Sequence, residues 1–295
     1  MTDRLIDLAE QPARLRVENG LLVIEPDNAD KTTLPLTDIA VLIVSHPQVR
    51  YTQAVLAGLA HAGAAFVACD DRHMPAAMLL PLECHSTQSE RFAKQAEAAL
   101  PVKKRLWQQI VTAKIRAQAR LLARAASGDQ GLFDMAARVR SGDPDNLEAQ
   151  AARRYWPALF GPEFRRDPDL DDQNVFLNYG YGVLRATVAR AICSAGLHPC
   201  LGVHHHNRYD AFPLADDLME PYRPLVDRAV FEWVKSCGQI APLDKHAKNA
   251  LLLALTGRID HEGESRTLFD LLSRSAASLA AVYMGERKEL VLPEL

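Results

Sequence analysis

The sequence predicts an α+β protein, with a small strand-rich N-terminal domain at residues 1–82 and a larger, all-helical C-terminal domain at residues 83–295. Short apolar runs separated by turn residues fill the first 80 positions, whereas stretches rich in Ala and Leu recur at helical spacing from about Gln88 onward. A chain of 295 residues that is 48% hydrophobic can bury one or two cores, so disorder is excluded as its main state.

The N-terminal domain is expected to contain at least four strands and one helix. The strands are predicted at Arg14 to Val17, Leu21 to Ile24, Ile39 to Val44 and Ala64 to Ala68. Asn19-Gly20 between the first two runs predicts a tight hairpin, because both turn positions require positive φ. Thr52 to His61 has helical periodicity and ends at Gly63. This order also suits a dinucleotide-binding unit, but that alternative is weak because no G-x-G-x-x-G follows Val44.

The C-terminal domain is expected to be a series of helices. Asp143 before Pro144 is typical of an N-cap and first-turn pair, and predicts a helix through Leu147, Ala151 and Tyr155. Further helices are predicted at Asn178 to Ala195, Asp217 to Lys235, Asp244 to Thr256 and Arg266 to Met284.

The distribution of charge changes what the net charge implies. A formal net charge of -3 and a pI of about 6.4 argue at first against a nucleic-acid partner. However, residues 81–166 hold 15 basic and 9 acidic side chains, so the middle of the chain is basic. Arg116, Arg120 and Arg124 lie four residues apart and share a helix face. This pattern fits either a solvated face or a stripe that follows a phosphate backbone.

The first ten residues lack a basic leader followed by an apolar run, which argues against a secretory signal. No apolar run reaches the ~18 residues that a membrane-spanning helix needs. We therefore expect a cytoplasmic protein without a membrane partner.

The densest group of polar residues lies between positions 202 and 227. It begins with Gly202-Val203-His204-His205-His206 and continues with Asp216, Asp217, Glu220 and Arg223. Spacings of three and four residues would place two of these carboxylates on one helix face, where an ordinary ion pair with Arg223 would explain them. The alternative is a divalent metal held by one imidazole and carboxylate oxygens. That donor set suits magnesium or manganese, whereas three imidazoles favour zinc.

A third carboxylate, Glu148, stands at the start of a predicted helix. On spacing alone, an acid that interacts favourably with the helix dipole explains it. Its neighbour Leu147 is expected to face the core, so Glu148 could also lie at the border of the buried face.

Four ordered motifs resemble the CRISPR-associated integrase family of the spacer-adaptation stage, in its type II form. The motifs are Leu-Glu-Ala-x-x-Ala-x-x-Tyr-Trp around Glu148, Asn-Tyr-Gly-Tyr at 178–181, Ala-Gly-Leu-His-Pro-Cys-Leu-Gly-Val-His-His at 195–205 and Asp-Asp-Leu-Met-Glu-Pro-Tyr-Arg-Pro-Leu-Val-Asp at 216–227. The chain length and the strand-rich beginning also agree with that family.

The resemblance implies a metal-dependent DNA endonuclease and integrase that inserts new spacer DNA into a CRISPR array. It implies that Glu148, His205 and Glu220 are the catalytic residues and the ligands of Mg²⁺ or Mn²⁺. It implies that Asp217, at a neighbouring acidic position, either supports one of these ligands from behind or is an alternate ligand. The histidine assignment depends on motif register, because His204 and His206 flank His205. The family acts on double-stranded DNA, as a homodimer bridged by a small ferredoxin-like partner protein, and its N-terminal domain is expected to serve in dimerisation.

Two rival interpretations remain open on the sequence. A zinc hydrolase would use His198 with His204 and His206. A non-catalytic DNA scaffold would use the basic helices alone, with the acids serving as ion pairs.

Overall fold

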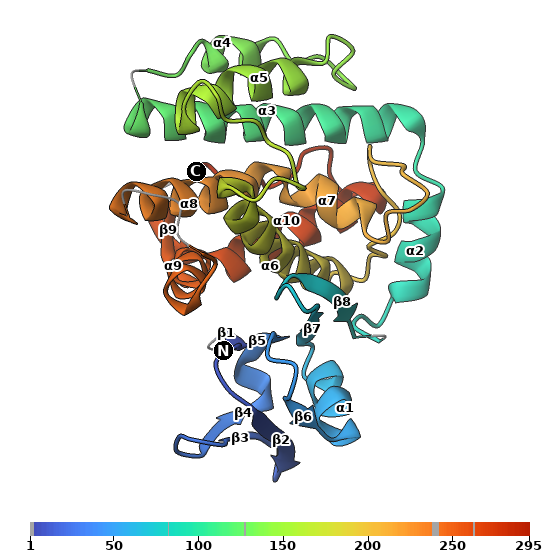
Figure 1. Ribbon diagram of the computed structural model, residues 1–295. Helices are drawn as coiled ribbons and strands as arrows, with labels where there is room; N and C mark the ends of the chain where they lie inside the picture. The colour runs from blue at the N-terminus through green and yellow to red at the C-terminus, as the bar shows by residue number, and fades with distance from the viewer. Residues whose placement is uncertain (1–2, 82, 127, 238–241, 262) are drawn as a thin grey trace.

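The computed structural model describes residues 3–81, 83–126, 128–237, 242–261 and 263–295 (Figure 1). Its N-terminal part contains β1 (Arg4–Leu8), β2 (Ala13–Glu18), β3 (Leu21–Pro26), β4 (Thr32–Pro35), β5 (Ile39–Val44), β6 (Arg50–Tyr51), α1 (Gln53–His61), β7 (Ala65–Cys69) and β8 (Pro75–Leu79). The helices that follow are α2 (Gln88–Ala96), α3 (Leu100–Ala125), α4 (Leu132–Ala137), α5 (Leu147–Phe160), α6 (Gln173–Ser194), α7 (Pro213–Met219), α8 (Arg223–Cys237), α9 (Lys245–Thr256) and α10 (Leu268–Tyr283). The short turns η1 (Leu36–Asp38) and η2 (Glu220–Tyr222) are 3₁₀ helices.

The predicted fold class is confirmed, with one correction. The C-terminal region is mostly helical, but it is not all-helical, because β9 (Arg258–His261) and β10 (Glu264–Thr267) form an antiparallel hairpin between α9 and α10. Burial alternates along β9, with Ile259 and His261 inside and their neighbours exposed. The sequence prediction missed this period-two signal because the run is only four residues long. The predicted domain boundary remains a prediction, since residue 82 lies outside the described residues.

The N-terminal part is built from two four-stranded sheets. One has the order β1-β5-β7-β8, with β1, β5 and β7 parallel, and the other has the order β4-β3-β2-β6. The predicted hairpin is confirmed, since Asn19 and Gly20 both adopt positive φ, of 50° and 76°, between β2 and β3.

The β1-β5-β7-β8 sheet is buried on both faces, which explains the unbroken apolar run of β5. Leu42 and Phe66 pack into a core shared with the second sheet and α1. Val41, Ile43 and Val67 point the other way, into the large core of the helical region. This alternation along β5 and β7 ties the strand-rich part to the helices.

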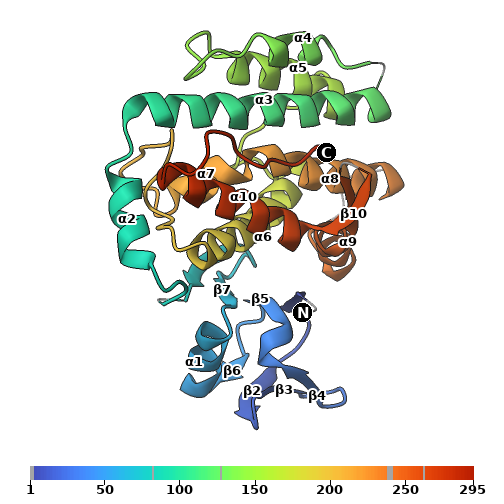
Figure 2. The same cartoon turned by 180° about the vertical axis from the view of Figure 1, so that it is seen from behind.

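In the helical region, the long helix α3 lies between two layers (Figures 1 and 2). The helices α4 and α5 pack on one side of α3, and α7, α8 and η2 contact it from the other. The central helix α6 packs against α7, α8 and α10. No helix in the described ranges is long and apolar enough to span a bilayer.

One predicted helix is broken where the sequence pattern suggested continuity. The predicted helix Asp217 to Lys235 is divided into α7, η2 and α8. Pro221 and Pro224 lie at the joints, and each removes a backbone N–H that a continuous helix would use. Glu220 pairs with Lys114 and Arg223, whereas Asp217 accepts from the backbone of residues 203–205, so the two carboxylates have different partners.

Candidate active site

Glu148 and Glu220 come from segments far apart in the sequence and meet at a single lysine. Lys114 Nζ lies 2.6 Å from Glu148 Oε1 and 2.5 Å from Glu220 Oε2. Because α3 runs between the layers that carry α5 and η2, its side chain can reach both carboxylates. The structure therefore brings together two of the three predicted ligands around Lys114, a cation within the basic middle of the chain that was not predicted as a site residue.

The position of Glu148 is fixed by the start of α5. Asp143 accepts hydrogen bonds from the backbone N–H groups of Leu147 and Glu148, at 2.9 and 3.0 Å. The N-cap is Asn146, whose side chain accepts from Ala149, so the prediction that Asp143 is the N-cap is wrong by three residues. Both Asp143 and Asn146 have positive φ, and the tight turn that results lets Asp143 satisfy the first helical amides from outside the helix.

Glu220 is only 4% exposed and is held by two cations. Arg223 Nε lies 2.9 Å from Glu220 Oε1, which is the ion pair three residues on that the sequence allowed. Burial raises the pKa of Glu220, but the charges of Arg223 and Lys114 outweigh burial and hold that pKa below its usual range. Burial likewise lowers the pKa of Lys114, and the charges of Glu220 and Glu148 reverse the shift. The group is therefore a buried, charge-balanced cluster of two carboxylates and two cations.

Asp217 organises the histidine loop through its side-chain carboxylate. Its fully buried carboxylate accepts hydrogen bonds from the backbone N–H groups of Val203, His204 and His205. It also lies 2.7 Å from His205 Nδ1. Gly202 is required for this close turn, because a Cβ there would lie 2.5 Å from the carbonyl oxygen of His205.

Among the three consecutive histidines, the geometry distinguishes His205. Its hydrogen bond with Asp217 raises its pKa, and the charges of Glu220 and Glu148 add to that effect against the burial penalty. His204 is engaged elsewhere, with its ring stacked on Trp107 at 4.1 Å and an interplanar angle of 3°, while His206 is exposed. Within the described ranges, no three His, Cys, Asp or Glu side chains gather as a ready-made metal cluster. The rival zinc trio of His198, His204 and His206 is therefore not assembled, and His205 is likewise not gathered with Glu148 and Glu220 into a preformed site.

A buried polar network that the sequence did not indicate lies behind the glutamates. The hydroxyls of Tyr155 and Tyr181 both donate to Asp227, the former at 2.7 Å. The guanidinium of Arg223 lies 4.5 Å from the centre of the Tyr181 ring. Tyr155 is on α5 and Arg223 and Asp227 are on α8, so the network fixes α5, which carries Glu148, relative to α8, which directly follows the turn that carries Glu220.

The residues of this cluster fit a divalent cation. A positive ammonium group already lies between two carboxylates that would repel each other without it. Two carboxylates with one imidazole form the hard, oxygen-rich donor set that Mg²⁺ and Mn²⁺ prefer. His205 Nδ1 is occupied by Asp217, which leaves Nε2 as the ring nitrogen for a ligand or a proton.

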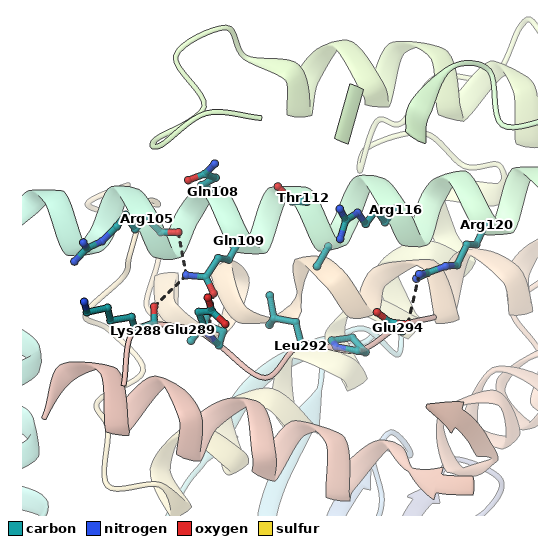
Figure 3. Close-up of a pocket in the computed structure, with 13 residues that line it drawn as sticks. Arg105, Gln108, Gln109, Thr112, Arg116, Arg120, Lys288, Glu289, Leu292 and Glu294 are labelled. Atoms are coloured by element: carbon teal, nitrogen blue, oxygen red, sulfur yellow. Dashed lines mark hydrogen bonds and ion pairs between the residues drawn. The ribbon is translucent and has the colours of Figure 1, made fainter. Parts of the chain in front are cut away.

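A basic groove lies between α3 and the C-terminal segment (Figure 3). It has a volume of about 490 Å³, and its lining includes Arg105, Arg116, Arg120, Lys288, Glu289 and Glu294. Gln109 holds the segment in place, since its side chain donates to the carbonyl of Lys288 at 3.3 Å and accepts from the N–H of Leu290 at 2.8 Å. The groove therefore has a fixed second wall.

The structure separates the three arginines that the helix spacing grouped. Arg116 and Arg120 line the groove, and Arg124 does not. Arg120 is partly neutralised by Glu294, 3.7 Å away, and donates to the carbonyl of Leu295. Arg105 and Lys288 also line the groove but were not predicted as site residues. Arg105 lies on the same helix as Arg116, and the folded C-terminal segment places Lys288 opposite that helix.

Comparison with known proteins identifies the family. Residues 7–259 match the family described as CRISPR associated protein Cas1. The chain is also 36% identical over 292 residues to the CRISPR-associated endonuclease Cas1 of Neisseria meningitidis serogroup C (strain 8013), covering 98% of this chain and 95% of that protein. The chain belongs to the Cas1 family. The resemblance drawn from the four sequence motifs is thereby confirmed.

Solved structures share the Cas1 fold of this chain. A casposase bound to integration product superposes with a TM-score of 0.78 at 19% identity, covering 97% of this chain and 91% of the other. A Cas6-RT-Cas1–Cas2 complex superposes with a TM-score of 0.75 at 19% identity, covering all of this chain and 36% of the other. The strand-rich part and the helical part are thus both included in the shared fold.

Proposed function

We propose that the protein is a divalent-metal-dependent DNA endonuclease and integrase that inserts new spacer DNA into a CRISPR array. The proposal rests on one observation: Glu148 and Glu220 meet around one cation, and the charges of both carboxylates raise the pKa of His205. Membership of the Cas1 family and the likeness to a casposase bound to integration product support the same chemistry.

In the proposed reaction, a 3′-hydroxyl of incoming DNA attacks a phosphodiester of the repeat by transesterification. A Mg²⁺ or Mn²⁺ ion held by Glu148, Glu220 and His205 would lower the pKa of that hydroxyl and neutralise charge on the phosphate. Asp217 positions His205 by pairing with Nδ1, which leaves Nε2 as the ring nitrogen that would hold the ion. Arg223 fixes the carboxylate of Glu220 through its 2.9 Å ion pair.

Double-stranded DNA is the proposed substrate. The basic groove is the proposed contact surface, and the helix stripe of Arg116, Arg120 and Arg124 is the alternative. Arg105, Arg116 and Lys288 face the groove and have no ion-pair partner within the described ranges. Arg120 and Arg124 extend the same helix. Neutralising Arg116, Arg120 and Arg124 together should weaken DNA binding and flatten its salt dependence.

The proposed partners are a second copy of this chain and a small Cas2-like, ferredoxin-like protein. The support is the superposition of the whole chain on part of a Cas6-RT-Cas1–Cas2 complex. The strand-rich region at residues 1–82 is the proposed dimerisation domain and residues 83–295 the proposed catalytic domain.

The site is tested by replacing Glu148, His205 and Glu220 singly by Ala. Each variant should lose Mn²⁺-dependent joining of a labelled duplex to a repeat-containing plasmid, because each removes a proposed ligand, while duplex binding measured without metal is kept. Glu163→Ala and His206→Ala are matched controls at exposed positions and should remain active. Full strand transfer in all three site variants would refute the assignment.

The same assay separates the rival functions. A DNA scaffold would bind duplex in a salt-sensitive way and show no strand transfer under any metal condition. A zinc hydrolase would carry tightly bound zinc after purification and would be unaffected by Glu148→Ala.

A further inference from the structure

The feature that the proposed function leaves unexplained is the place of Lys114. Its ammonium is within 2.6 Å of both glutamates, and its side chain is only 12% exposed. Lys114 is thus not a solvated member of the basic face of α3. It occupies the point between the two carboxylates where a cation has the greatest attraction.

The charge balance of the cluster determines how a second cation would interact with it. Glu148, Glu220, Lys114 and Arg223 together carry no net charge, so the cluster is balanced as it stands. A divalent ion on the same carboxylates would face the ammonium at close range in a poorly solvated place, where like charges repel strongly. The ion and the ammonium therefore compete for the same oxygens.

The shape of the site favours displacement of the lysine and leaves Arg223 in place. Arg223 is packed over the Tyr181 ring and is fixed on the same turn as Glu220. The ammonium of Lys114 is carried on a flexible four-carbon stem. Within the described ranges, its ion pairs are those with the two glutamates. Its ammonium can move without unfolding α3.

We propose that Lys114 is a resident counter-cation, which holds the carboxylate pair in the metal-free protein, is displaced by a divalent ion, and then becomes available to a DNA phosphate. The proposal rests on the proposed metal site and adds to it a residue that competes with the metal for the two carboxylates. It predicts that metal alone binds weakly, and that DNA strengthens metal binding because a phosphate accepts the released ammonium. By linkage, metal should strengthen DNA binding by the same factor.

The first test measures Mn²⁺ binding by isothermal titration calorimetry in the absence of DNA. Lys114→Met should bind Mn²⁺ at least tenfold more tightly than the unchanged protein, about 1.4 kcal/mol, because the competing charge is gone. Lys103→Met is the matched control on the same helix and should leave the affinity unchanged, since Lys103 forms no ion pair within the described ranges. Equal or weaker Mn²⁺ binding by Lys114→Met would overturn the proposal.

The second test measures the coupling between metal and DNA. A short duplex should raise the Mn²⁺ affinity of the unchanged protein and of Lys103→Met, and should raise that of Lys114→Met much less. Equal coupling in all three proteins would contradict the release of the ammonium to a phosphate.

A third test uses the unchanged protein, so it does not depend on the folding of a variant. Brief acetylation followed by mass spectrometry should modify Lys114 more in Mn²⁺ than in its absence, because the displaced ammonium becomes accessible, while modification of Lys103 stays constant. Unchanged or reduced labelling of Lys114 would contradict displacement.

The outcomes distinguish the two proposals. If the unchanged protein does not bind Mn²⁺, or if Glu148→Gln binds it equally well, the metal site itself is wrong. If Glu148→Gln loses Mn²⁺ binding but Lys114→Met binds Mn²⁺ with the same affinity as the unchanged protein, only the counter-cation proposal fails.

Discussion

At the scale of single residues, the carboxylates of this protein differ in their surroundings more than in their chemistry. Asp217 accepts three backbone N–H groups and a ring nitrogen, Glu220 pairs with two cations, and Asp227 is held by two tyrosines. The sequence motifs already assigned different roles to these acids, with Glu220 as a proposed ligand and Asp217 as a supporting or alternate one. They could not reveal how Asp217 acts, because its contacts with the backbone of residues 203–205 exist only in the folded loop.

The ionisation of Asp227 predicts how the stability of the folded protein changes with pH. Burial raises the pKa of Asp227 to about 6, although the hydrogen bonds from Tyr181 and Tyr155 oppose the shift. The folded protein therefore binds a proton more tightly than the unfolded chain does, so this group's contribution to stability falls as pH rises from about 4 to about 6. Tyr181→Phe removes one opposing hydrogen bond, raises the pKa further, and should extend the fall in stability to higher pH.

Urea unfolding between pH 4 and pH 8 measures this effect. Tyr155→Phe should behave like Tyr181→Phe, whereas Tyr179→Phe should not, because the Tyr179 hydroxyl donates to Asp7. An unchanged pH profile in both of the first two variants would show that the tyrosines do not control the ionisation of Asp227.

At the scale of elements, periodicity predicted the positions of the last two helices well, whereas α6 begins five residues before its predicted start at Asn178. The expected helices at 244–256 and 266–284 are confirmed as α9 and α10 within two residues at their starts. The start of α5 was misplaced because Asp143 and Asn146 both adopt positive φ. Spacing does not reveal a tight turn of this kind, in which a carboxylate caps amides four and five residues ahead of it.

Capping by Asp143 is tested by Asp143→Ala. The change leaves the first amides of α5 without their acceptor and should lower the free energy of unfolding by about 1–2 kcal/mol. Because one of these amides belongs to Glu148, metal binding should weaken as well. Asp145→Ala is the matched control in the same turn, since Asp145 forms only an exposed pair with Arg140 and should cost well under about 1 kcal/mol. Equal losses in the two variants, measured by urea unfolding, would contradict a capping role for Asp143.

At the scale of the whole molecule, the net charge of -3 does not predict whether DNA is the partner, because folding gathers acidic and basic side chains at different places. Acidic side chains from α5 and η2 are collected at the candidate active site, around Lys114. Basic side chains of α3 are turned toward the C-terminal segment, where Lys288 joins them across the groove. The sequence predicted that a basic surface exists on this helix. It could not predict the groove, since its two walls are more than 160 residues apart along the chain.

The position of the groove yields a prediction that separates it from the simple helix stripe. Arg105 and Arg116 are eleven residues apart on α3, a rise of about 16 Å, and Lys288 faces them from the opposite wall. If DNA follows the groove, Arg105→Gln, Arg116→Gln and Lys288→Gln should each reduce the slope of log affinity against log salt by about 0.9, the value for one lost phosphate contact. Arg124→Gln should leave the slope unchanged, because Arg124 does not line the groove.

If DNA follows the stripe of Arg116, Arg120 and Arg124 instead, Arg124→Gln will reduce the slope as much as Arg116→Gln does, and both Arg105→Gln and Lys288→Gln will leave it unchanged. Fluorescence anisotropy of a labelled duplex between 50 and 300 mM salt distinguishes the two surfaces, because they share only Arg116 and Arg120.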